Sequence, residues 1–344
     1  MNQILFEMAD LQSRGEPFVL ATVISRNGSA PRSAGARMLI RADGSTSGTV
    51  GGGILEARVQ RLAAEVMVNH TAVIQGFSFT GKDASTMDSI CGGQVEVLVE
   101  WLDSKDPALA EVIMGLQEAA SHHLKAWLVT CLPARSSSPL HALVHPDGRV
   151  TGCLPAGLST DTVVAIRHPD LVHFGQQQAM IDPVNINGTA YVFGAGHVSR
   201  SLAEFTASVG FWTVVLDDRV DYASLERFPT ADERVVLEFF ADAFSKVEVD
   251  RDSFIVIVTR GHLHDRTVLA QALKTRAGYI GMIGSRRKCG LIIDELRKEG
   301  FSEEDIRRVH APIGLPIQAE TPEEIGISIV AEMIQVRSQL TVGI

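Results

Sequence analysis

Three consecutive glycines, Gly51, Gly52 and Gly53, interrupt the stretch GTVGGGILEARVQRLAAEV between a β-like segment and an amphipathic helix. Glycine loses more conformational freedom on folding than any other residue, so three in a row need a physical reason. Amide groups at a helix start have no partner within the helix, and with the helix dipole they attract anions. The turn is therefore a candidate anion site. Glu56, in the first helical turn, either belongs to that site or only stabilises the positive helix end.

Two further residues in the N-terminal half carry suitable chemistry. Arg32, in SAPRSAG, could approach the glycine turn and pair with an anion. Cys91, which opens CGGQVEV, is a candidate for thiol chemistry, although cysteines are commonly inert small hydrophobes. The sequence contains no CxxC pair that would indicate a zinc site or an iron–sulfur cluster.

A second glycine turn, GAGHVS, follows the apolar segment TAYVF. Gly194 permits a tight turn, Gly196 lets the backbone approach a pyrophosphate at a helix start, and His197 follows directly. Asp217 or Asp218 lies about 20 residues downstream at the end of the next strand, where an acid binds a ribose hydroxyl. The pattern predicts a Rossmann fold. Its ligand stays open between a nucleotide such as NAD(P), another phosphate-bearing cofactor, and none.

The stretch TRGHLHD follows the hydrophobic strand SFIVIV, and ligands of open parallel sheets bind beyond the carboxyl ends of strands. Arg260 and His262 are therefore candidate cofactor-binding residues. His262 and His264 could also ligate a metal together with Asp265. The alternative, which we favour, is that Asp265 caps the following helix and the histidines fill the loop.

The stretch GMIGSRRKCG also follows a strand and places Ser285, Arg286 and Lys288 at a helix start. Basic side chains beside free amides suit a phosphate group. The alternative is an ordinary solvated helix end.

The elements that position these residues divide the chain into two parts. Residues 1–185 indicate an α+β domain in which residues 125–157 repeat the pattern of residues 18–53: strand, turn, strand, Asp-Gly hairpin, strand, glycine. The aligned residues are Asp43-Gly44 with Asp147-Gly148, and Gly48 with Gly152. The second copy lacks Arg32 and the triple glycine, which indicates a degenerate duplication whose first copy alone kept its site. Chance resemblance between two hairpins is the alternative.

From residue 189 onward, short apolar strands alternate with helical stretches, which is typical of a parallel, doubly wound sheet. The predicted fold class is therefore α/β, with a second, Rossmann-like domain over residues 186–344.

The bulk composition excludes several classes of partner. The formal net charge is −10 and no basic block offsets it, which argues against nucleic acid and against an anionic membrane. No window approaches the roughly 20 apolar residues that span a bilayer, and the first residues do not read as a signal peptide. Four widely spaced cysteines favour reduced thiols, so a cytoplasmic protein is expected.

Taken together, these motifs resemble the XdhC/CoxI family of accessory proteins, which mature xanthine dehydrogenase and related molybdenum hydroxylases. The resemblance covers nearly the whole chain and rests on several separate stretches in the right order. They are GSAPRSAGARMLI, GTVGGGILE, CGG, FGAGHVS, TRGHLHD, YIGMIGSRRK and RVHAPIGLPIQAETPEEIGISIVAEMI. One departure is Gln318, where the family pattern leads us to expect a glycine, with a local effect only.

The resemblance implies a chaperone rather than an enzyme. It implies binding of molybdenum cofactor (molybdopterin), protection while the sulfido ligand is installed by a cysteine desulfurase or other sulfurtransferase, and delivery to an apo-hydroxylase. The terminal phosphate of the cofactor suits a glycine-rich helix start, and a thiolate suits molybdenum, which favours Cys91 as the metal ligand. We place the cofactor between residues 51–53, Cys91 and the Rossmann crevice, with Arg32 and Arg286 as phosphate partners. A homodimer is compatible with this role, but the sequence does not show one.

Two other functions fit the motifs. In the first, the Rossmann domain uses NAD(P) and the protein is an oxidoreductase with His262 or His264 as the acid–base group, although no Tyr-Lys or Cys–His pair supports it. In the second, the chain is a docking scaffold that brings a sulfurtransferase to the hydroxylase, and its motif glycines serve packing alone.

Overall fold

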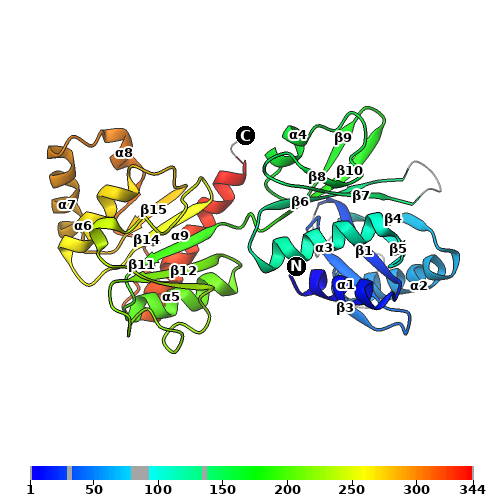
Figure 1. Cartoon of the computed structure of the whole chain (residues 1–344), viewed down its shortest axis with the longest axis horizontal. Coiled ribbons are helices and arrows are strands. Elements are labelled where there is room, and N and C mark those ends of the chain that lie inside the picture. The colour runs from blue at the N-terminus through cyan, green and yellow to red at the C-terminus, as the bar shows by residue number, and fades with distance from the viewer. Residues whose placement is uncertain (1, 29–32, 79–92, 134–137, 343–344) are drawn as a thin grey trace. The chain divides into compact units, whose positions relative to one another are not determined.

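The computed structural model describes residues 2–28, 33–78, 93–133 and 138–342, and the structural statements below concern these ranges. The chain forms two compact units, residues 1–186 and 187–344 (Figure 1). The first is α+β and the second contains a parallel sheet, so the predicted α/β fold class is confirmed. No helix in these ranges is long and apolar enough to cross a membrane.

Two five-stranded antiparallel sheets form the first unit, with strand orders β3-β2-β1-β5-β4 and β8-β7-β6-β10-β9. The first copy contains α1 (Asn2–Arg14), β1 (Phe18–Asn27), β2 (Arg37–Ile40), β3 (Thr46–Gly48), α2 (Gly53–Asn69), β4 (Ala72–Ser78) and β5 (Gln94–Leu102). The second contains α3 (Pro107–Ser121), β6 (Ala126–Cys131), β7 (Leu140–Val144), β8 (Val150–Gly152), α4 (Thr160–Ala165), β9 (Asp170–Phe174) and β10 (Gln177–Val184). The predicted duplication is confirmed, and it extends over the whole unit.

Two equivalent glycines show how closely the copies correspond. Gly48 and Gly152 end the third strand of each copy with φ angles of 79° and 83°. A Cβ atom at Gly48 would lie 2.5 Å from the carbonyl oxygen of Arg37, and one at Gly152 would lie 2.5 Å from that of His141. Glycine is therefore required at both positions, because a side chain would meet the neighbouring strand.

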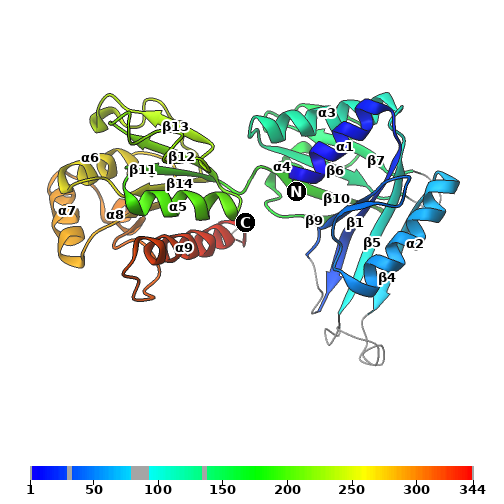
Figure 2. The same ribbon diagram turned by 90° about the horizontal axis from the view of Figure 1, so that it is seen from below.

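The helices of the first unit cover the sheets in equivalent ways. The first helices of the two copies, α1 and α3, lie side by side and share one apolar core with both sheets (Figure 2). The helices α2 and α4 each cover the other face of their own sheet. Each sheet is thus packed on both faces, which explains why the first seven residues of β1 and all of β6 are buried.

Two buried ion pairs join the copies. Arg37 of β2 pairs with Asp182 of β10, and His141 Nε2 of β7 lies 3.1 Å from Glu100 Oε2 of β5. Glu100 lies opposite Leu20 of β1, and Asp182 lies opposite Leu128 of β6, so the two acids occupy equivalent positions in the fifth strands of the two copies. The two ion pairs are therefore reciprocal. Each joins the second strand of one copy to the fifth strand of the other. Burial raises the pKa of Asp182, against the opposing effect of Arg37.

Six parallel strands form the second unit in the order β13-β12-β11-β14-β15-β16, which is the Rossmann order 3-2-1-4-5-6. The strands are β11 (Thr189–Phe193), β12 (Trp212–Asp217), β13 (Glu233–Val236), β14 (Ser253–Ile257), β15 (Tyr279–Met282) and β16 (Val309–His310). The helices are α5 (His197–Ser208), η2 (Phe240–Asp242), α6 (His262–Ala272), α7 (Arg286–Lys298), α8 (Glu303–Arg307) and α9 (Pro322–Val342). Helices α5 and α9 cover one face of the sheet, and α6 and α7 cover the other (Figure 1 and Figure 2).

Gln318 lies in the segment before α9 and has a φ angle of 62°. This left-handed conformation carries no penalty for glycine, which explains the expectation of a glycine at this position.

Candidate functional site

Three motifs that are distant in the sequence meet at the carboxyl edge of the parallel sheet. Strand β11 lies between β12 and β14. The glycine turn at residues 194–196, which follows β11, therefore lies between Asp217 and Asp218 on one side and Arg260 on the other. This edge is where ligands of doubly wound sheets bind.

Gly194 and Gly196 of this turn occupy their positions for different structural reasons. Gly194 has a φ angle of 110°, and a Cβ atom there would lie 2.4 Å from the carbonyl oxygen of Val258. Gly196 is the N-cap of α5, makes no side-chain cap, and its Cβ would meet no atom within 4 Å. His197 is the exposed first residue of α5. The first glycine is thus needed for packing, whereas the second faces open space in front of a helix start, as an approaching anion requires.

Asp217 holds the glycine turn in place. Its carboxylate is buried and accepts hydrogen bonds from Ala195 N–H at 2.8 Å, Arg219 N–H at 3.0 Å and Arg219 Nε at 2.8 Å. A ribose hydroxyl would have to compete with these donors. The sequence motifs did not single out Arg219, although its place directly after two acids at a strand end was a usable signal.

Asp218 points instead toward the loop that follows β14. Arg260 makes a bidentate pair with it, in which Nη2 donates to Oδ2 at 2.7 Å. This hydrogen bond lowers the pKa of Asp218 and raises that of Arg260. Two predicted cofactor-binding residues are thus brought together, but as partners of each other.

An aromatic ring fixes two more arginines near the turn. The guanidinium of Arg219 lies 3.5 Å from the ring centroid of Tyr222, and that of Arg227 lies 4.5 Å from it. Arg227 Nη2 also donates to the carbonyl oxygen of Ala195 at 3.4 Å. The edge therefore carries three arginines, of which sequence reasoning identified only Arg260.

Asp265 corrects one expectation. The N-cap of α6 is Gly261, so Asp265 does not cap the helix but lies within its first turn. Its buried carboxylate accepts from Thr259 N–H at 3.1 Å and Thr259 Oγ1 at 2.6 Å, and it also pairs with Lys288 of α7. Asp265 closes the loop before the helix and ties α6 to α7.

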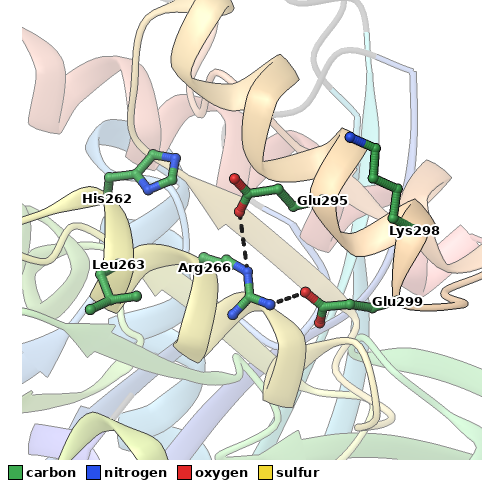
Figure 3. Close-up of a pocket in the computed structure, with 6 residues that line it drawn as sticks. All are labelled: His262, Leu263, Arg266, Glu295, Lys298 and Glu299. Carbon is green, nitrogen blue, oxygen red and sulfur yellow. Dashed lines mark hydrogen bonds and ion pairs between the residues drawn. The ribbon is translucent and has the colours of Figure 1, made fainter.

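His262 lines a groove of about 480 Å³ between α6 and α7 (Figure 3). In the middle of the groove, Arg266 lies between two glutamates, with its Nε 3.2 Å from Glu295 and its Nη2 paired with Glu299. These pairs satisfy the arginine within the protein.

The ring of His264 packs against Phe240 with centroids 4.9 Å apart. Within the ranges that the structure describes, no group of three or more His, Cys, Asp or Glu side chains could hold a metal ion. The metal site predicted at His262 and His264 therefore has no third ligand among the described residues.

The start of α7 differs from the starts of α5 and α6. Ser285 is its N-cap, and Ser285 Oγ accepts from Lys288 N–H at 3.2 Å. Arg286 follows as an exposed first residue. Its predicted contact with a phosphate remains a prediction.

The glycine turn of the first unit is closed by Glu56. Gly51, Gly52 and Gly53 have φ angles of 145°, 78° and 55°, which glycine adopts most easily. Glu56 accepts from Gly52 N–H at 2.9 Å and from Thr49 Oγ1. These contacts match the structural role that the sequence left open for Glu56. Added Cβ atoms at Gly52 and Gly53 would meet nothing within 4 Å, so the outer side of the turn is open.

Arg32 and Cys91 lie outside the residues that the structure describes. Of the other cysteines, Cys131 and Cys289 are buried and Cys153 is exposed. Burial raises the pKa of the Cys131 thiol to about 11 and also raises that of Cys289.

The protein thus consists of a duplicated antiparallel unit followed by a Rossmann unit, which carries a glycine turn at the carboxyl edge of its sheet. Comparison with known families agrees with this division. Residues 11–77 match the model of the XdhC and CoxI family, and residues 190–333 match the model of the XdhC Rossmann domain. The chain belongs to the XdhC and CoxI family.

Named relatives span both units. The chain is 28% identical over 330 residues to a probable xanthine dehydrogenase subunit of Bacillus subtilis, covering 95% of each chain. It is 22% identical over 334 residues to the molybdenum cofactor insertion chaperone PaoD of Escherichia coli, covering 94% of this chain and 84% of PaoD. It is 27% identical over 341 residues to the uncharacterized protein YqeB of Escherichia coli, but this covers 99% of this chain and only 47% of YqeB, so the chain spans about half of that relative.

A solved structure is also similar. It is the crystal structure of a xanthine dehydrogenase from Bacillus halodurans, with a TM-score of 0.77 and 27% identity over 97% of this chain and 96% of that one.

Proposed function

We propose that this protein is an accessory factor for a molybdenum hydroxylase of the xanthine dehydrogenase type. In this proposal it binds molybdenum cofactor, protects it while sulfur is installed, and delivers it to the apo-enzyme. The observation that carries the proposal is the match to a molybdenum cofactor insertion chaperone over 94% of the chain, across both units.

The residues present suit such a cargo. A terminal phosphate fits the start of α5, which begins at a glycine that makes no side-chain cap and faces open space. The start of α2 is also open at Gly52 and Gly53, but an anion there would have to displace Glu56 from the N–H of Gly52. A soft metal prefers thiolate ligands. Buried Cys131 and Cys289 with raised pKa values are poor thiolates, so Cys91 is the proposed metal ligand and exposed Cys153 the natural comparison.

The proposed site residues follow from this cargo. In the first unit the proposed anion contacts come from the glycine turn and Arg32, and in the second from the glycine turn, His197 and residues that follow β14 and β15. They are Arg32, Gly51, Gly52, Gly53, Gly194, Gly196, His197, Arg260, Ser285 and Arg286. Proposed partners are the apo-hydroxylase, a sulfurtransferase and a second copy of this chain. Residues 1–185 and 186–344 are proposed as the two functional domains.

Cofactor retention tests the proposal. Purified protein is mixed anaerobically with isolated molybdenum cofactor, and molybdenum is quantified after gel filtration for wild type, Cys91→Ala and Cys153→Ala. We expect roughly stoichiometric retention by wild type and Cys153→Ala, and loss in Cys91→Ala. Equal retention by all three would keep the carrier function but remove Cys91 from it. Absence of retention in every sample would overturn the carrier function and favour the docking scaffold.

Use of NAD(P) remains a second candidate function, favoured by the Rossmann strand order and the glycine turn. Hydride transfer from NADPH or NADH to a redox dye, measured with purified protein, would distinguish an oxidoreductase from a carrier.

A further inference from the structure

A salt bridge crosses the glycine turn of the second unit. We propose that Asp218 and Arg260 form a clasp over residues 194–196, and that a phosphate-bearing ligand binds there only by taking Arg260 away from Asp218. Asp218 then opposes ligand binding, although its place at the end of β12 is that of a ribose-binding acid.

The strand order makes the pair a clasp. Asp218 follows β12, Arg260 follows β14, and β11 with its glycine turn lies between these strands. A side-chain pair that joins the two outer strand ends must therefore pass across the end of β11. Each oxygen of Asp218 accepts one hydrogen bond from the guanidinium, so a ribose hydroxyl would have to share the carboxylate with Arg260.

The groups around the turn favour binding of an anion to Arg260 in place of Asp218. Gly196 faces open space at the uncapped start of α5, and Gly261 does the same at the start of α6. Arg227, whose Nη2 contacts Ala195, has a buried Nε atom with no hydrogen-bond partner in the described part of the chain. Through its Nη2 contact with Ala195, Arg227 places a positive charge beside the turn.

When Arg260 leaves Asp218, the Asp218 carboxylate still has a cation beside it. Arg219 Nε lies 3.9 Å from Asp218 Oδ1, so Arg219 can hold Asp218 after Arg260 has turned to a phosphate. The side chain of Arg260 is 40% exposed and that of Asp218 is 17% exposed. An exchange between partners at the surface costs little, because exposed ion pairs contribute little to stability. Asp217, which accepts from Ala195 N–H and from Arg219, keeps the turn in shape throughout.

Calorimetric titration of the full chain with inorganic pyrophosphate and with ADP tests the clasp. We expect Asp218→Asn to tighten binding of both probes roughly threefold to fivefold, because the competing carboxylate is lost. Arg260→Gln should weaken both about tenfold or more, because a charge-assisted contact is lost. If Asp218 bound a ribose, Asp218→Asn would weaken ADP and leave pyrophosphate unchanged, which would overturn the clasp.

Matched controls separate the clasp from general charge effects. Asp221→Asn removes the same charge three residues away, and Arg266→Gln removes an arginine from the groove between α6 and α7. Both should leave the two dissociation constants unchanged, and equal effects in these controls would refute the proposal. So would failure of both wild type and Asp218→Asn to bind either probe at millimolar concentration. The clasp does not depend on the accessory role, because neither probe contains molybdenum or a pterin.

Discussion

Single carboxylates organise both glycine turns. Glu56 accepts from Gly52 N–H and Thr49 Oγ1 at the start of α2, and Asp217 accepts from Ala195 N–H at the start of α5. In each case an acid satisfies an amide of the turn and places negative charge at the positive helix end. The residues that look like ligand contacts are therefore first of all what keeps the turns formed.

Replacing Glu56 by Ala should destabilise the first unit by about 1 kcal/mol, because the turn loses its closing acceptor. Thermal unfolding monitored by circular dichroism measures the change. Glu65→Ala on the exposed face of the same helix is the control. An equal loss of stability in both variants would contradict the role given to Glu56.

His123 gives the first unit a defined response to acid. Burial, with added repulsion from Lys125, lowers the pKa of His123 to about 4 from 6.5. The unfolded chain therefore binds a proton below pH 6.5 that the folded chain refuses, so stability is lost as the pH falls from 6.5 toward 4. Since the group is partly exposed, the contribution is about 1–2 kcal/mol.

We expect His123→Asn to remove this part of the acid sensitivity. Asparagine tolerates the φ angle of 52° at this position and carries no titratable group. Urea unfolding at about pH 7 and about pH 4.5 should show a smaller difference in the variant than in wild type. An unchanged difference would show that His123 titrates normally.

At the level of elements, the duplicated copies are held together by reciprocal ion pairs that differ in kind. Arg37 faces the carboxyl group of Asp182, whose pKa burial raises, whereas His141 with Glu100 can remain hydrogen-bonded when the imidazole is neutral. Removing one member of a buried charge pair leaves the other charge uncompensated. This costs far more stability than removing the hydrogen-bond partner of a neutral histidine.

Asp182→Asn should therefore cost about 3–5 kcal/mol, because it leaves the Arg37 charge buried without its counter-charge. The double variant Arg37→Met with Asp182→Leu should recover much of this loss. Urea unfolding of the two variants beside exposed Asp161→Asn gives the comparison. A double variant that is less stable than Asp182→Asn would argue against charge burial as the cause.

At the scale of the whole molecule, each unit has its own cores. The clusters on the two faces of the Rossmann sheet contain only residues of the second unit. A segment with a complete core can fold by itself.

Residues 187–344 expressed alone should therefore unfold cooperatively, with a circular dichroism spectrum typical of an α/β fold. The heat-capacity trace of the fragment measures this. A fragment without a cooperative transition would show that it needs residues 1–186.

Local features of both units were readable in the sequence. The Asp-Gly hairpins, the glycine turns and the strand–helix alternation depend on backbone preferences within short stretches, so they revealed the duplication and the Rossmann fold. The tertiary structure alone decided which side chains meet. Asp218 reaches Arg260, Asp265 reaches Lys288 and Arg37 reaches Asp182 only because strand order and helix packing place them together. Such pairings depend on contacts between distant segments, and no local pattern encodes them.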